Sequence, residues 1–163
     1  RVAPARDLSS QEYAAQGDLH AALQKQRACG RFLSESQVLQ WFLPIVCGVR
    51  HLHAHGIVHR DLKSLNIVLQ AGVPMICDLG ISRYRSDDTV FMRSFCGTPA
   101  YLSPEMAANQ PYTENTDVWA LGVLLYELAA LSLPFAGPRR ATRPWPPALA
   151  AALSRRLAAW SLR

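Results

Sequence analysis

Residues 118–138 carry a single charged side chain, Glu127, and this stretch constrains the fold more than any other. A membrane-spanning helix would place Glu127 near the bilayer centre, at a cost of about 2–3 kcal/mol, with Pro134 close behind it. A helix over residues 116–130, apolar nearly all round and therefore buried in a globular domain, fits the pattern better. The sequence predicts a fold built around this helix, with no membrane partner.

Other segments predict further helices and one hairpin. Residues 34–56 carry apolar side chains at alternating steps of four and three, after Ser34 and Gln37, which form a capping-box pattern. A shorter helical pattern runs from Gly17 to Gly30. Two short apolar runs around Ala71 and Gly72, within residues 67–77, predict a β-hairpin. Residues 79–104 show no period and predict a long loop. The expected fold is mainly α, of the α+β class.

The positive charge of the chain lies in one place. The 163 residues contain 17 basic and 12 acidic side chains, a net charge of +5, but residues 139–163 hold six arginines and no acid. The remaining 11 basic and 12 acidic side chains leave the body at −1. A nucleic-acid interpretation therefore depends on the tail alone, and we expect no nucleic-acid partner. Residues 134–147, which lead into the tail, hold five prolines, and residues 148–162 can form a basic, alanine-rich helix.

Cysteine and histidine spacing gives little support for a metal centre. None of the four cysteines forms a C-x-x-C pair, which makes a zinc knuckle or a thioredoxin-like motif a poor fit, and a reducing compartment fits best. His51 and His55 stand at the i,i+4 spacing of some zinc pairs. No glutamate lies between them, so we favour structural roles for these histidines.

Five short motifs follow one another in order. Residues 59–66 read H-R-D-L-K-S-L-N, and residues 78–80 read D-L-G. G-T-P, S-P-E and D-V-W-A-L-G then begin at residues 97, 103 and 117. Together they resemble the C-terminal lobe of a eukaryotic protein kinase. The details around them are most similar to the NIMA-related kinases.

The resemblance implies a chemistry for these residues. Phosphoryl transfer depends on positioning and on charge neutralisation. Asp61 would accept the proton of the substrate hydroxyl, Lys63 would stabilise the transferring phosphoryl group, and Thr98 would hydrogen-bond toward both. Asn66 and Asp78 would supply oxygen ligands to Mg²⁺, which prefers them. Lys63 and the G-T-P motif match the serine/threonine subclass, so ATP, Mg²⁺ and a protein substrate are the expected partners.

Further residues take regulatory or structural roles by the same resemblance. Arg60 would pair with a phosphate on Ser94, although Ser94 also fits an ordinary solvated loop serine. Leu79 stands where the family has phenylalanine, and we expect it to pack behind His59. Two acidic residues, Glu105 and Asp117, have structural roles. Glu105 would lack its family arginine unless an arginine of the tail replaces it.

The resemblance covers only part of a kinase domain. The backbone of Glu12 and Ala14 would grip adenine, with Val68 beneath the ring. No G-x-G-x-x-G motif occurs, and the only two lysines, Lys25 and Lys63, follow these positions. We therefore expect the N-terminal lobe to be absent.

This expectation divides the chain into three parts. Residues 1–10 would be an irregular remnant, residues 11–137 a partial kinase domain, and residues 138–163 an extension. The expected location is cytoplasmic, with cytoskeletal association by family resemblance. The alternative to an enzyme is a catalytically inactive, kinase-like binding or regulatory module.

Overall fold

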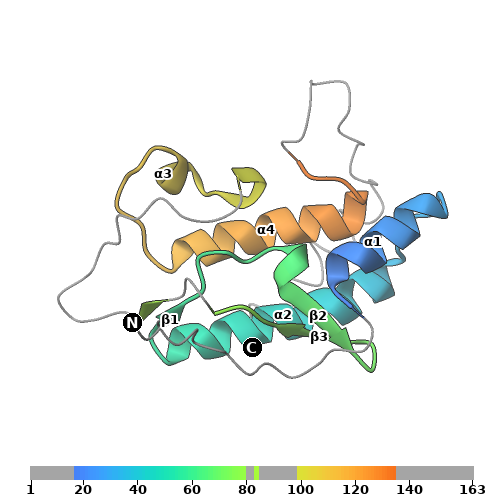
Figure 1. Ribbon diagram of the computed structural model, residues 1–163, viewed down its shortest axis with the longest axis horizontal. Helices are drawn as coiled ribbons and strands as arrows, with labels where there is room; N and C mark the ends of the chain where they lie inside the picture. The colour runs from blue at the N-terminus through green and yellow to red at the C-terminus, as the bar shows by residue number, and fades with distance from the viewer. Residues whose placement is uncertain (1–16, 80–82, 85–98, 135–163) are drawn as a thin grey trace, which may run out of the picture.

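The computed structural model describes residues 17–79, 83–84 and 99–134 (Figure 1). Within these ranges the fold is mostly helical, with two small antiparallel strand pairs. The elements are α1 (Leu19–Ala28), α2 (Glu35–Ala54), β1 (Ile57–Val58), the 3-10 helix η1 (Ser64–Asn66), β2 (Ile67–Gln70), β3 (Val73–Ile76), β4 (Arg83–Tyr84), the 3-10 helix η2 (Pro99–Tyr101), α3 (Pro104–Ala107) and α4 (Asn115–Ala130). This content confirms the predicted mixture of helices and a small hairpin.

The ends of α2 follow the predicted signals. The backbone N–H of Gln37 donates to the Ser34 hydroxyl at 3.2 Å, which satisfies one free amide of the first turn. The capping box is only half formed, because the Gln37 side-chain amide donates to Gln40 instead. Gly56 follows the helix with a φ of 71°, a left-handed conformation that costs glycine little.

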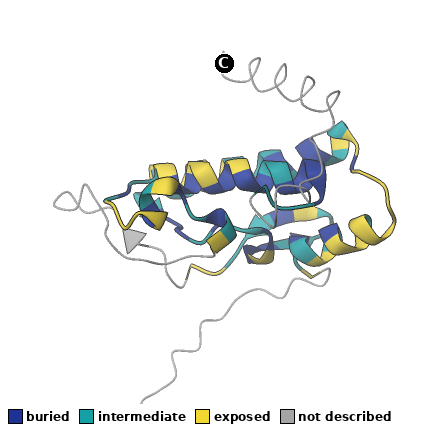
Figure 2. Ribbon diagram, turned by 90° about the horizontal axis from the view of Figure 1, so that it is seen from above, coloured by how far each residue is buried: buried dark blue, intermediate teal, exposed yellow. Residues whose placement is uncertain are grey.

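The long helices form the centre of the molecule. In Figure 1, α2 and α4 lie alongside each other and run in opposite directions, and the β2–β3 hairpin packs on α2. Gly48 permits this approach, since a Cβ at that position would lie 2.9 Å from the Ile76 side chain. The buried apolar face of α2 consists of Val38, Leu39, Phe42, Ile45 and Val49. Figure 2 shows exposed turns on the outer side of the helical layer and buried residues inside it.

The β2–β3 hairpin has the geometry that its short loop requires. Ile67 pairs with Ile76, and the register continues to the pair formed by Gln70 and Val73. The two loop residues, Ala71 and Gly72, have φ angles of 50° and 77°. Positive φ at both central positions defines the turn whose twist matches that of the flanking strands. The predicted hairpin is therefore confirmed.

Two predictions about local structure were wrong in part. The expected loop over residues 79–104 contains β4, which pairs with β1, and the short helix η2. A two-residue strand is too short to show a sequence period. Helix α4 is not buried all round, because Val118 and Trp119 are 55% and 37% exposed. The described elements cover only one side of this helix.

Glu127, the lone charged residue of the 118–138 stretch, is buried and hydrogen-bonded in α4. Its side chain is only 6% exposed and accepts hydrogen bonds from the Tyr101 and Ser64 hydroxyls. Among the described residues, no helix is long and apolar enough to cross a membrane.

The hairpin turn offers a test of the local backbone. Ala71 is exposed and left-handed, a conformation that costs an L-residue about 1–2 kcal/mol and that asparagine tolerates better. We expect Ala71→Asn to raise the free energy of unfolding by about 0.5–1 kcal/mol, measured by urea denaturation. The matched control is Ala108→Asn, an exposed alanine with a φ of −84°. An equal or larger gain in the control would contradict the turn assignment.

Candidate functional site

The segment formed by residues 59–66 is anchored by a carboxylate of α4. Asp117 is 1% exposed, and its Oδ2 and Oδ1 accept hydrogen bonds from the backbone N–H groups of His59 and Arg60, each at 2.9 Å. His53, near the end of α2, places its Nε2 2.8 Å from Asp117 Oδ2. One buried side chain therefore joins α2, α4 and the start of the 59–66 segment.

His59 connects this segment to the end of the hairpin. The backbone N–H of Asp61 donates to His59 Nδ1 at 3.3 Å, so Nδ1 is the acceptor nitrogen of the ring. The proton then lies on Nε2, which donates to the carbonyl of Cys77 at 3.1 Å. The imidazole is fully buried, and its role is to fix two backbone segments relative to each other.

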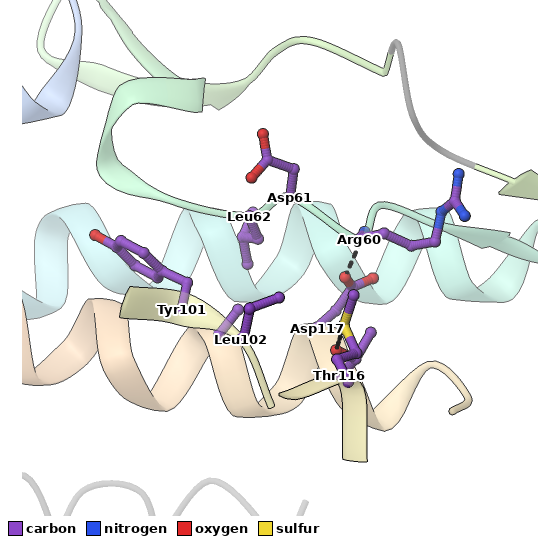
Figure 3. A pocket seen from close by; sticks show the side chains of 9 residues that line it. Arg60, Asp61, Leu62, Tyr101, Leu102, Thr116 and Asp117 are labelled. Atoms are coloured by element: carbon purple, nitrogen blue, oxygen red, sulfur yellow. Dashed lines mark hydrogen bonds between the residues drawn. The ribbon is translucent and has the colours of Figure 1, made fainter. Parts of the chain in front are cut away.

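Asp61 lies at the centre of a small polar cluster. Lys63 Nζ is 2.6 Å from Asp61 Oδ2, and the Asn66 side-chain amide donates to the same oxygen at 3.1 Å. The amide of Asn66 also donates to the Asp61 carbonyl at 2.8 Å. Figure 3 shows the Asp61 carboxylate pointing away from α4, whereas Asp117 points from α4 toward Arg60. The sequence prediction placed Asp61, Lys63 and Asn66 together, and the structure brings them together.

Asn66 and Asp78 are held close by the backbone. The N–H of Cys77 donates to the Asn66 carbonyl at 2.9 Å, which places Asp78 one residue beyond this bond. Because Asn66 Nδ2 donates to Asp61, the amide oxygen is the side-chain atom of Asn66 that could coordinate a cation. An amide oxygen and a carboxylate suit Mg²⁺, which is bound through one or two carboxylates together with substrate phosphates. The two residues fit the predicted ion.

A neutral thiol lies beside this pair. Burial raises the pKa of the Cys77 thiol above its ordinary value, and the nearby carboxylates of Asp78 and Asp18 raise it further. The thiol therefore stays protonated near neutral pH and adds no negative charge next to Asp78.

Backbone strain is concentrated at the same site. Arg60 and Asp78 have φ angles of 70° and 62°, in the left-handed region that non-glycine residues rarely adopt. Such residues persist where the surrounding structure fixes them, and they cluster at functional sites. The hydrogen bond from Arg60 to Asp117 provides this restraint on one side.

A second polar network was not predicted from the sequence. Glu127 accepts hydrogen bonds from Tyr101 and, at 3.1 Å, from Ser64. The Tyr101 hydroxyl also lies 3.3 Å from Ser64 Oγ. The sequence did contain a signal for this network, namely the lone charge of residues 118–138, because a buried carboxylate requires hydrogen-bond donors. The network ties η1, which ends the 59–66 segment, to η2 and α4.

The other residues that the sequence predicted to be functional are only partly described by the structure. Val68 is in β2, where it pairs with Met75 and forms an isolated bridge with Asp18. Arg60 is largely buried and directs one guanidinium nitrogen to the Tyr112 hydroxyl at 3.4 Å. Glu12, Ala14, Ser94 and Thr98 lie outside the described residues.

Leu79 and Glu105 were both expected to have structural roles. Leu79, expected to pack behind His59, is instead 49% exposed, and it follows Asp78, whose φ of 62° is left-handed. Glu105 is half-buried, and within the described part of the chain no ion pair is found for it.

Comparisons with known proteins agree with this geometry. The protein kinase domain model matches residues 8–146. The chain belongs to the protein kinase family. It is 44% identical over 128 residues to human serine/threonine-protein kinase Nek5. The aligned region covers 77% of this chain and 18% of Nek5. It is 35% identical over 144 residues to the probable serine/threonine-protein kinase nek1 of Dictyostelium discoideum, covering 77% of this chain and 30% of that protein.

These relatives place the chain among the NIMA-related serine/threonine kinases, as the motifs predicted. Mouse serine/threonine-protein kinase Nek4 is 42% identical over 120 residues, which cover 73% of this chain. The chain spans less than a third of the length of each of these curated relatives. It therefore aligns with only part of each of these proteins.

The anchoring role of Asp117 can be tested by its removal. Asp117→Ala leaves two buried backbone N–H groups of the 59–66 segment, those of His59 and Arg60, without an acceptor, at a cost of about 1–3 kcal/mol each. We expect the free energy of unfolding to fall by about 2–5 kcal/mol in urea denaturation. Asn115→Ala, at an exposed position on the same helix, is the control and should change it by less than about 0.5 kcal/mol. Equal midpoints for the two variants would contradict the anchoring role.

The Tyr101–Glu127 pair predicts a pH dependence. Burial, and next the Glu127 carboxylate, raise the pKa of the Tyr101 phenol well above its ordinary value. Above about pH 10 the unfolded chain loses this proton while the folded chain keeps it, so folding stability falls as the pH rises. We expect Tyr101→Phe to cost about 1–2 kcal/mol at neutral pH, because a buried carboxylate loses a donor.

The stability difference between the wild type and Tyr101→Phe should shrink above about pH 10, since only the wild type suffers the alkaline loss. Urea denaturation at about pH 8 and about pH 10.5 measures it. Tyr126→Phe, at a partly exposed position of α4, is the control. A difference for Tyr101→Phe that stays constant across this range would exclude the coupling.

Proposed function

We propose that this chain is the C-terminal lobe of a kinase that transfers the γ-phosphoryl group of Mg·ATP to serine or threonine hydroxyls of proteins. The observation that carries the proposal is the cluster in which Lys63 and Asn66 both contact Asp61 Oδ2, at 2.6 and 3.1 Å. A general base must be held in a fixed orientation near the hydroxyl that it deprotonates. Two donors on one carboxylate oxygen provide that orientation.

Each residue of the cluster has a separate role in this proposal. Asp61 accepts the proton of the substrate hydroxyl as the oxygen attacks phosphorus. The Lys63 ammonium lies next to Asp61 and offsets negative charge on the transferring phosphoryl group. Asn66 orients Asp61 through its amide nitrogen and presents its oxygen on the other side. Positioning and charge neutralisation are the main contributions to phosphoryl transfer.

Asn66 and Asp78 would hold the metal ion. A bound Mg²⁺ neutralises charge on the nucleotide phosphates. The adenine-binding roles of Glu12, Ala14 and Val68, and the regulatory pairing of Arg60 with a phosphate on Ser94, are parts of the same proposal. A protein substrate is supported by the relatives, which are named serine/threonine-protein kinases. Cytoplasmic location, including association with the cytoskeleton, is also proposed.

The alternative is a binding or regulatory module without catalysis. We expect low activity for the 163-residue chain by itself, because kinases also use a lysine and a glutamate that precede the adenine-binding segment to position phosphates. The only lysines here are Lys25, in α1, and Lys63. We expect this chain alone to transfer phosphate slowly even if the protein from its full coding sequence is active.

A radiolabelled ATP assay separates the two functions. Asp61→Asn in the protein expressed from its full coding sequence should lower transfer to a general protein substrate by about 10²–10⁴-fold, since it removes the proton acceptor. The control, Glu35→Gln, makes the same change of carboxylate to amide at the start of α2 and should leave transfer unchanged.

Two outcomes of this assay would contradict these expectations. Equal activity of Asp61→Asn and the wild type would exclude the catalytic role. Rapid turnover by the repurified 163-residue chain, abolished by Asp61→Asn, would contradict the expectation of low activity for this chain alone.

A further inference from the structure

Two exposed histidines lie next to each other at the end of α2. The ring centroids of His51 and His55 are 4.3 Å apart, and the ring planes are inclined by 44°. The sequence favoured structural roles for the histidines of this region, and His53 has one, since its Nε2 lies 2.8 Å from Asp117 Oδ2. His51 and His55 each lie about 160° around the helix from His53, so they face away from α4.

The hydrogen bond of His55 determines which of its ring nitrogens carries a lone pair. Its Nδ1 lies 2.8 Å from the backbone carbonyl oxygen of His51. A carbonyl can only accept, so Nδ1 carries the proton and Nε2 of the neutral ring keeps its lone pair. Histidines that bind metals almost always donate the other ring N–H to a carboxylate, a backbone carbonyl or water, which fixes the orientation of the ring. His55 already has this arrangement.

The separation of the two rings suits a shared ion. Zinc binds histidine nitrogen at about 2.0–2.1 Å, so two nitrogens on one ion lie at most about 4.2 Å apart. Rings with centroids 4.3 Å apart can present nitrogens within that separation. Residues four apart are neighbours on a helix surface, and histidine pairs with this spacing bind zinc in the H-E-x-x-H helix.

We propose that His51 and His55 chelate a divalent transition metal ion, for which imidazole is a preferred ligand, and that this ion is Zn²⁺. The described residues contain no group of three or more ligating side chains, so water molecules complete the coordination. Mg²⁺ prefers oxygen ligands and is not bound by this pair. The site is separate from Asn66 and Asp78, and the proposal does not depend on phosphoryl transfer.

The position of the pair favours a cation and gives the ion a structural effect. The last carbonyl groups of a helix carry partial negative charge, which attracts cations, although the exposed side chain of Arg50 opposes this attraction. An ion that bridges His51 and His55 closes the last turn of α2, where the chain leads into β1 and the 59–66 segment. Because the ion binds the folded helix, it stabilises this junction.

Calorimetric titration of the complete 163-residue chain with Zn²⁺, in excess Mg²⁺, tests the proposal. We expect His51→Gln and His55→Gln each to weaken Zn²⁺ binding at least about tenfold, because a single imidazole loses the advantage of chelation. The matched control is His20→Gln, which removes a partly exposed histidine of α1 and should leave the affinity unchanged.

Cys47 requires a control of its own. It is a free, exposed cysteine one helical turn before His51, and a cysteine thiolate is also a zinc ligand. Cys47→Ser should keep the Zn²⁺ affinity of the wild type. A tenfold loss in this variant would assign the ion to Cys47 and His51 and would overturn the proposal.

Urea denaturation shows whether each variant is folded. Without metal, the two glutamine variants should unfold at nearly the midpoint of the wild type, since both positions are exposed. With Zn²⁺, the wild-type midpoint should rise and the midpoints of the two variants should not. Unchanged Zn²⁺ affinity in His51→Gln or His55→Gln would overturn the proposal, as would the absence of Zn²⁺ binding by the wild-type chain.

Discussion

The geometry of the site depends on the hydrogen bonds of one buried carboxylate. Asp117 accepts the backbone N–H groups of His59 and Arg60 and contacts His53, so α4 fixes both α2 and the start of the 59–66 segment. Hydrogen bonds to an ionised acceptor are stronger than those between neutral groups, and few water molecules can compete at 1% exposure. The unusual backbone of Arg60 is stable because its amide must reach Asp117.

A second buried carboxylate holds the other end of the same segment. Glu127 accepts from Ser64, ten residues along α4 from Asp117, which corresponds to about 15 Å of helix. The four steps from Arg60 to Ser64 extend over about 13 Å, so the chain can run alongside α4 between these two anchors. Asp61 and Lys63 lie within this span. The two acidic side chains of α4, Asp117 and Glu127, therefore both bind the 59–66 segment, one near each end.

The sequence was sufficient for features set by local chemistry. The hairpin follows from a two-residue loop, α2 from its cap and period, and the Asp61–Lys63–Asn66 cluster from a motif whose members are close along the chain. Contacts between distant residues were not predictable from pattern alone. The β1–β4 pair is two residues long, and the partners of Glu127 lie 26 and 63 positions away. The exposed side of α4 was missed because a uniformly apolar helix gives no sign of which face is covered.

The residues that hold the site in place differ from the carboxylates that would take part in the chemistry. His59 and Asn66 both bond to the backbone of Cys77, one through the Cys77 carbonyl and the other through its N–H. These bonds fix the hairpin end against the 59–66 segment without using the side chain of Asp78. In the proposed function, Asp61 and Asp78 can therefore remain in place while their carboxylates engage a substrate and a cation. Because neither bond uses the carboxylate of Asp61 or Asp78, the alignment of the two segments does not depend on what those carboxylates contact.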